Sequence, residues 1–407
     1  MPDNQAHTNL LRALVTLIIC CSMSAVFISQ TPHSPRWDQS TLINSHRYPA
    51  IHSGLTSQLL VRPISIHGAA DKTLLNTQVR MLGMFVYLTG AWLLALSVLK
   101  DPRLIFFFMA LVLVSRYPFL WLSSELFAGG LLCAAIAVLN KRSRPLAGGI
   151  LLGLAGLSKP DIILTSMVLV AVCLFLSRDR PQYNIKIVCA FFLTLTLMIL
   201  PGIIQHGASY ISPDVEPGSH SRSFFSFGQH YAALKSEPQQ IPDKNPWLSW
   251  ESYMAEDFPN AHSVKDVVFK HTGTYLAFVG KSAQRGASNF LLTFHVLTLA
   301  LVFAWMARSE FRADRAMVLI GWTLIGMLPL VLLSYPHVRY FARWLPLVLI
   351  FLMFCYRELA KKTDDRRITM LRRGVLGSLI LYFLCSVILI IGDYQQWVVG
   401  ETYWFPD

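Results

Sequence analysis

The sequence predicts an all-α integral membrane protein with about eleven transmembrane helices and two long extracytoplasmic segments. Its 407 residues are 54% hydrophobic and only 14% charged, whereas soluble domains have about 25% charged residues. Apolar runs such as Ile187–Ile204 and Val375–Ile391 contain no charged residue and approach the ~20 residues that span a bilayer. The formal net charge of +12 is concentrated in short segments between such runs.

The first apolar run, 13–29, follows a short polar start that ends in Arg12. No A-x-A-like cleavage site follows it, so we expect an uncleaved first span rather than a secretory signal. The hydropathy pattern places the remaining spans near 81–99, 104–119, 122–139, 146–158, 161–177, 187–206, 287–306, 316–334, 343–357 and 374–392.

The short connections at every second turn are basic, which is the pattern of cytoplasmic loops. They hold Lys141, Arg142 and Arg144, then Arg178, Arg180 and Lys186, then Arg308, Arg312 and Arg315, and finally Arg357, Lys361, Lys362, Arg366, Arg367, Arg372 and Arg373. The N-terminus is then cytoplasmic and the tail 392–407 extracytoplasmic. The positive charge therefore indicates topology, and no nucleic-acid partner is expected.

Two segments long enough to have a function lie on the outer side, 30–80 and 207–285. They divide the chain into an N-terminal transmembrane module (1–206, which includes 30–80), an outer segment (207–285) and a C-terminal module with an outer tail (286–407). Apolar residues between Val264 and Val279 recur at helical spacing, which predicts an amphipathic helix on the membrane surface.

Nothing in the sequence indicates a metal site or a cofactor. All seven cysteines lie in apolar runs, where a packing role is the usual one. No CxxC, HExxH, GxGxxG or Walker-type loop occurs, which argues against a zinc protease and an ATP-driven pump.

Charged residues near the outer ends of spans are the candidate site residues, because a charge at membrane depth costs about 2.5–3.5 kcal/mol. The stretch "HVRYFAR" contains His337, Arg339, Tyr340 and Arg343. Guanidinium groups bind phosphate oxygens bidentately, so we expect a phosphate site supported by His337 and Tyr340. The alternative is that the arginines anchor the chain at the lipid headgroups.

Lys159 ends an apolar run of about a dozen residues, too short for a full crossing. It is therefore expected below the outer surface, as a phosphate ligand or as the ion-pair partner of Asp161. Asp38 follows the first span and is a candidate general base, or else a solvated loop residue or helix N-cap. Arg116 and Glu125 flank a proline-containing turn, where they are expected to pair and support the site.

Together these features resemble the GT-C membrane glycosyltransferases, which take a sugar from a polyprenyl-phosphate donor. The likeness to the protein O-mannosyltransferases and the lipid A aminoarabinose transferase covers most of the chain. It rests on the order and placement of "SSELFAGGLL", "AGGILLGLAGLSKPD" and "HVRYFARWLPLVLIF", and on the acid at Asp38. Many members have adjacent Asp–Glu in the first loop, whereas Gln39 follows Asp38 here, which leaves an inactive relative open.

The resemblance implies a GT-C-like fold in the bacterial inner membrane and a lipid-linked sugar as donor. The acceptor would be a glycan, lipid or protein, and membrane lipids would surround the chain. Asp38 would activate the acceptor, with Lys159 and Arg339 near the lipid phosphate. Two other classes stay open: a lipid-linked glycan ligase or polymerase of another fold, and a glycolipid transporter or flippase.

Overall fold

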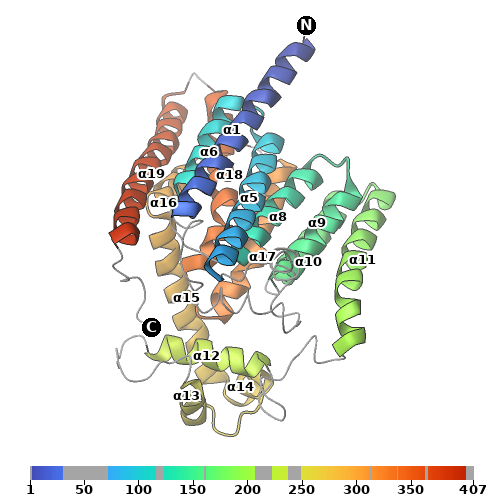
Figure 1. Cartoon of the computed structure of the whole chain (residues 1–407), viewed down its shortest axis with the longest axis vertical. Coiled ribbons are helices and arrows are strands. Elements are labelled where there is room, and N and C mark those ends of the chain that lie inside the picture. The colour runs from blue at the N-terminus through green and yellow to red at the C-terminus, as the bar shows by residue number, and fades with distance from the viewer. Residues whose placement is uncertain are drawn as a thin grey trace.

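The computed structural model describes residues 2–30, 72–115, 123–159, 162–206, 222–236, 249–311, 314–336, 338–362 and 365–399. All regular structure in these ranges is helical (Figure 1). Asp38, Arg116 and His337 lie outside the described residues, as does most of the first outer segment.

Within the described ranges, five helices are long and apolar enough to cross a membrane, which is the pattern of a multi-pass membrane protein. They are α1 (Pro2–Gln30), α5 (Lys72–Val98), α11 (Pro181–His206), α17 (Arg315–Leu333) and α19 (Arg366–Val399). A sixth span is made if α15 (Thr272–Phe294) and α16 (Leu297–Met306), which meet at a 99° bend, are taken as one.

Four further apolar helices are shorter. They are α6 (Pro102–Val114), α8 (Ser123–Asn140), α9 (Pro145–Ser158) and α10 (Ile162–Leu176). The 16-residue helix α18 (Leu345–Ala360) is apolar on most sides and is the central helix, since eleven of its residues are buried. The structure confirms an all-helical fold, while the number eleven stays a prediction because these helices are short.

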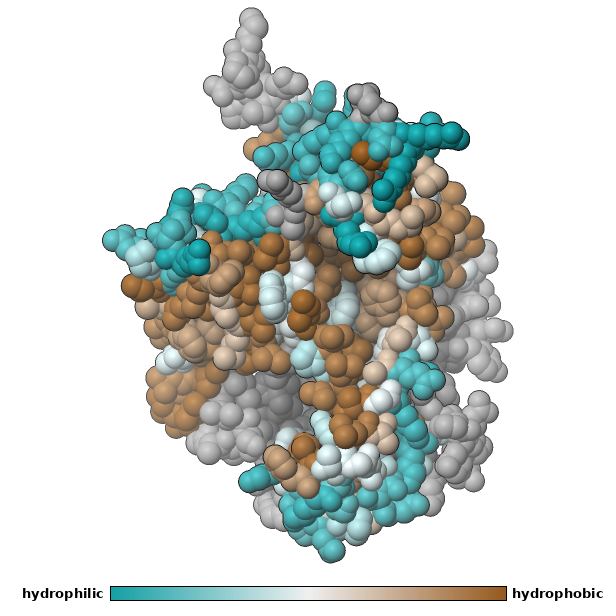
Figure 2. Space-filling model, turned by 180° about the vertical axis from the view of Figure 1, so that it is seen from behind, coloured by the Kyte–Doolittle hydropathy of each residue, from teal (hydrophilic) through white to brown (hydrophobic). Residues whose placement is uncertain are grey.

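The surface has an apolar belt between two hydrophilic ends (Figure 2). Helices α11 and α19 contribute to the exposed apolar surface with side chains such as Leu197 and Ile388, which are 60% and 69% exposed. Large exposed apolar side chains along whole helices are expected where lipid tails replace water.

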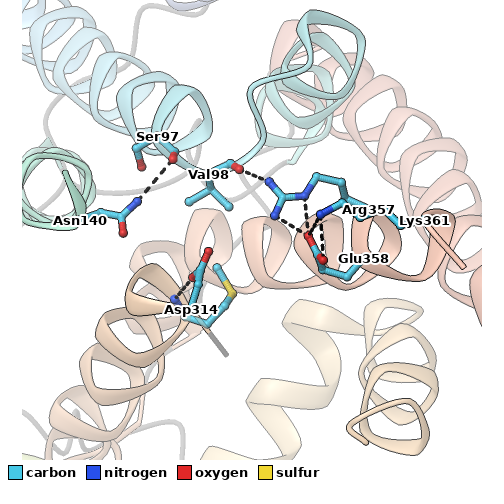
Figure 3. Close-up of polar contacts among 8 residues, drawn as sticks. Ser97, Val98, Asn140, Asp314, Arg357, Glu358 and Lys361 are labelled. Atoms are coloured by element: carbon cyan, nitrogen blue, oxygen red, sulfur yellow. Dashed lines mark hydrogen bonds and ion pairs between the residues drawn. The ribbon is translucent and has the colours of Figure 1, made fainter. Parts of the chain in front are cut away.

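One end of the bundle, here called the basic end, is closed by arginines that bind the last carbonyl groups of other helices. Arg357 of α18 donates to Val98 O at the end of α5, as Figure 3 shows. Arg315 of α17 donates to Leu139 O of α8 at 3.1 Å and to Leu176 O of α10 at 3.3 Å. Helix carboxyl ends carry unpaired carbonyls and partial negative charge. These arginines hydrogen-bond to the carbonyls and balance the partial charge.

The opposite end carries a layer of short helices, α12 (Arg222–Ser236), α13 (Trp250–Asp257) and α14 (Val264–Lys270), packed on the start of α15. Its core is aromatic and includes Phe227, Tyr231, Phe258 and Phe278. This layer, called the layer end, lies below the bundle in Figure 1.

The helix predicted over 264–279 is broken at His271, which ends α14 and precedes α15. Helix α15 then continues through 285 into the predicted span 287–306. The predicted end of the outer segment therefore falls inside a helix. The sequence there has no proline, and neither glycine of this helix before 285 interrupts it.

Glycines bring α5 and α8 into backbone contact, which fixes the helix that carries Glu125. A Cβ atom at Gly130 would lie 2.4 Å from Val86 O, and one at Gly90 would lie 2.0 Å from Gly130 O. Small residues allow this close approach between membrane helices.

Gly130→Ala is expected to destabilise the protein by about 1–3 kcal/mol, because the new methyl group overlaps the α5 backbone. The thermal unfolding of the purified protein in detergent measures this. Gly321→Ala on α17 is the matched control, since no atom of another helix lies within 4 Å of its Cβ position. Equal melting temperatures for the two variants would contradict the packing described.

Candidate functional site

A buried carboxylate lies between two cations away from the basic end. Glu125 stands in the first turn of α8, and its side chain is fully buried. Its Oε1 atom accepts a hydrogen bond from Lys159 Nζ, and its Oε2 atom forms an ion pair of 2.8 Å with Arg343 Nε. These three side chains, with Tyr340, are called the Glu125 cluster.

Lys159 reaches the cluster because α9 ends early. The 14 residues of this helix rise about 21 Å, which is less than the ~30 Å hydrocarbon thickness of a bilayer. The backbone of Lys159 is extended (φ −152°, ψ 122°), so the chain leaves the helix at this residue. An ammonium group at that depth is costly, and Glu125 supplies the compensating charge.

Arg343 is only 1% exposed and is the largest fully buried side chain in the described part of the protein. It ends the 3-10 helix η4 (Val338–Arg343), which leads into α18. Its stem lies on α8, where a Cβ at Gly129 would be 3.5 Å from Arg343 Cγ. Tyr87 Oη of α5 donates a hydrogen bond of 2.9 Å to Ala342 O, and this contact holds η4 on the bundle.

The ring of Tyr340 faces both cations. Its centroid is 5.3 Å from Lys159 Nζ and 5.9 Å from Arg343 Cζ, and its side chain is 5% exposed. An aromatic face attracts cations at such distances, most strongly where water is excluded. Tyr340 therefore adds to the stabilisation of two positive charges that share one carboxylate.

The segment before η4 is tied to the layer end. The backbone N–H of Tyr335 donates to His230 Nδ1 of α12 at 3.1 Å. Arg285 Nη2 of α15 donates to Tyr335 Oη at 3.2 Å, and Asn289 of the same helix donates to Pro336 O. The layer thus packs directly against the chain that positions Arg343.

A second polar group holds the layer itself together. Tyr231 Oη and Lys235 Nζ on α12 donate to Asp257 Oδ2 at 2.7 and 2.6 Å, which joins α12 to the end of α13. Burial, and then the hydrogen bond to Asp257, raise the pKa of the Tyr231 phenol above its usual value. Both oxygen and nitrogen donors of this group are engaged, which indicates a structural role.

Four of the residues singled out from the sequence are brought together in the Glu125 cluster. Lys159 and Arg343 were predicted as phosphate ligands, and Tyr340 and Glu125 as supporting residues. Within the described residues Glu125 pairs with both Lys159 and Arg343, a pairing that was not predicted from the sequence. The predicted pairs of Glu125 with Arg116 and of Lys159 with Asp161 involve residues outside the described ranges.

The other predicted site residues are placed only in part. The backbone of Arg339 lies in η4, one turn before Arg343. Asp38 and His337 lie outside the described residues, so their proposed roles stay predictions. Sequence reasoning missed His230, Arg285 and Tyr87, whose partners are at least 50 residues away along the chain.

In the described part of the chain, no group of three or more His, Cys, Asp or Glu residues could hold a metal ion. The Glu125 cluster instead brings two cationic side chains, Lys159 and Arg343, onto one buried carboxylate. Neighbouring cations of this kind can bind the oxygens of a phosphate group.

A scan against protein-family models and searches of curated proteins and of solved structures found no match to the chain.

Proposed function

We propose that the protein is a membrane glycosyltransferase that moves a sugar from a polyprenyl-phosphate donor to an extracytoplasmic acceptor. The fold would be GT-C-like, with about eleven spans that include the short helices. One observation carries the proposal: Glu125 holds two cations, Lys159 and Arg343, at one place in the bundle, next to the segment on which the layer end packs. A lipid phosphate, which lies at the membrane interface, has the negative charge that two such cations bind.

The proposed reaction breaks the bond between the anomeric carbon of the sugar and the phosphate oxygen. The acceptor hydroxyl or amine attacks that carbon, its proton passes to Asp38, and polyprenyl phosphate leaves as an anion. Fixed cations stabilise charge that develops on a leaving group. Lys159 and Arg343 supply that charge, with Arg339 and His337 as further phosphate ligands from the same segment as Arg343.

Glu125 has a positioning role in this proposal. Its two oxygens hold Lys159 and Arg343 on neighbouring elements, so both cations face one location. Tyr340 covers them, and Arg116 would support the turn before α8. The layer end, which packs against the segment before η4, would cover the reacting groups and bind the acceptor.

An assay in membranes tests the function. Vesicles containing the protein are supplied with labelled polyprenyl-phosphate hexoses and pentoses, and transfer of label to envelope glycans, lipids and proteins is measured. We expect one lipid-linked donor to be used, and vesicles without the protein are the control. Movement of intact labelled donor across the vesicle membrane without transfer would instead identify a flippase.

The proposed orientation places the basic end in the cytoplasm and the layer end outside. In a Cys189→Ser background, which removes the exposed native thiol, an impermeant thiol reagent is expected to label Ser252→Cys on α13 in intact cells. Ser309→Cys, in the turn after α16 at the basic end, is expected to be labelled only after the cells are opened. Labelling of position 309 in intact cells would contradict this orientation.

A further inference from the structure

A wide-open surface cavity of about 520 Å³ lies at the basic end, where α9 and α11 begin. Its lining residues are Pro145, Arg180, Pro181, Gln182, Tyr183 and Lys186. This cavity is separate from the Glu125 cluster, because α9 starts at one and ends at the other. The proposed reaction does not involve this cavity.

The lining is cationic. Arg180 and Lys186 each contribute one positive charge, and no carboxylate lines the cavity. The nearest acid in sequence is Asp179, whose carboxylate is 3.7 Å from Arg180 Nε in a pair that is more than half exposed. Exposed pairs of this kind contribute little, so Arg180 can exchange that partner for a stronger anion. Tyr183, whose hydroxyl faces Leu139 O at 3.5 Å, forms the wall towards the bundle.

An apolar stripe runs along α11 from the cavity towards the layer end. Leu193, Leu197, Leu200 and Ile204 follow Lys186 at intervals of seven, eleven, fourteen and eighteen residues, so they lie on nearly the same side of the helix. Their side chains are 57%, 60%, 45% and 76% exposed. Of the apolar window of α11, only 17% is buried, the smallest share among the five long spans.

We propose that this cavity binds the headgroup of an anionic phospholipid from the leaflet at the basic end. The lipid phosphate lies between Arg180 and Lys186, and an acyl chain lies along the α11 stripe. Basic pockets between membrane helices are recognised features of anionic-lipid binding. The stripe selects a lipid over a soluble phosphate, because only a lipid carries an apolar chain that covers it. This inference does not depend on the proposed glycosyl transfer.

Native mass spectrometry of the purified protein in detergent tests the proposed lipid site, with added phosphatidylglycerol as the probe and phosphatidylcholine as the neutral comparison. The variant Arg180→Gln/Lys186→Gln is expected to retain phosphatidylglycerol roughly thirtyfold more weakly than the wild type, which corresponds to two cations near an anionic lipid. The matched control is Arg366→Gln/Arg367→Gln, which removes the same charge from α19 at the same end, outside the cavity lining.

Both variants change exposed residues, and equal melting temperatures in phosphatidylcholine alone will show that both fold. Equal retention of phosphatidylglycerol by the two variants would overturn the proposal. Glycerol phosphate that displaces the lipid at equal concentration would also overturn it, since the ligand would then be a soluble phosphate.

Discussion

Replacing Glu125 with glutamine is expected to destabilise the protein by about 3–5 kcal/mol, the usual effect of removing one partner from buried ion pairs. Glutamine keeps the shape of the side chain but removes its charge. Lys159 and Arg343 would then lie close together in a buried site without their shared carboxylate. Thermal unfolding in detergent, or resistance to denaturation in a mixed micelle, measures the loss.

The matched control is Glu256→Gln. Glu256 also accepts from a lysine, Lys235, but its side chain is 70% exposed, so its loss should change the free energy of unfolding by about 1 kcal/mol or less. A double variant, Glu125→Gln/Arg343→Met, removes both partners of one pair. Its loss should be smaller than the sum of the two single losses, because the residues are directly coupled. A Glu125→Gln protein as stable as the control would contradict the burial described.

Lys159→Gln, unlike Glu125→Gln, is expected to keep near-normal stability but to lower the turnover of sugar transfer about 10²–10³-fold. This variant leaves the ion pair of Glu125 with Arg343 in place. It removes one of the two cations that the proposal places at the leaving phosphate. The rate of transfer from the lipid-linked donor and the melting temperature must be measured together.

Lys141→Gln provides the control for Lys159→Gln. Lys141 lies between α8 and α9 at the basic end and is exposed, so its loss removes the same charge without touching the cluster. We expect it to transfer sugar at the wild-type rate. Full activity of Lys159→Gln would remove Lys159 from the site, whereas a loss of stability equal to that of Glu125→Gln would give it a purely structural role.

Local signals predicted the helices that begin or end at strong sequence features. The segment predicted over 146–158 is α9, because Pro145 is suited to a first turn and Pro160 cannot continue a helix. The predicted span 287–306 is instead bent at His295, where φ is 20° and ψ is −101°. Neither proline nor glycine marks this bend, so no local rule could have placed it.

Helix α12 was not predicted, although the pattern was present in the sequence. Phe224, Phe227, Tyr231 and Leu234 recur at helical spacing and are all buried in the aromatic core of the layer.

The Glu125 cluster was predictable from the sequence only as a set of residue types. Charges near span ends marked Lys159, Arg343 and Glu125 individually, but their pairing depends on how α8, α9 and η4 pack, which a local pattern does not contain.

The arginines at the basic end also have a consequence for the order of biogenesis. Val98, at the end of α5, is bound by Arg357, which lies 259 residues later in the chain. Leu139 and Leu176 are bound by Arg315, which lies 176 and 139 residues later, but Leu176 also accepts from the earlier Arg142 and Leu139 from Tyr183. At about 5–20 residues per second, a ribosome needs on the order of a quarter of a minute to a minute to supply Arg357 after Val98. Helix α5 therefore enters the membrane well before the arginine that binds its last turn is made, whereas α8 and α10 have earlier partners.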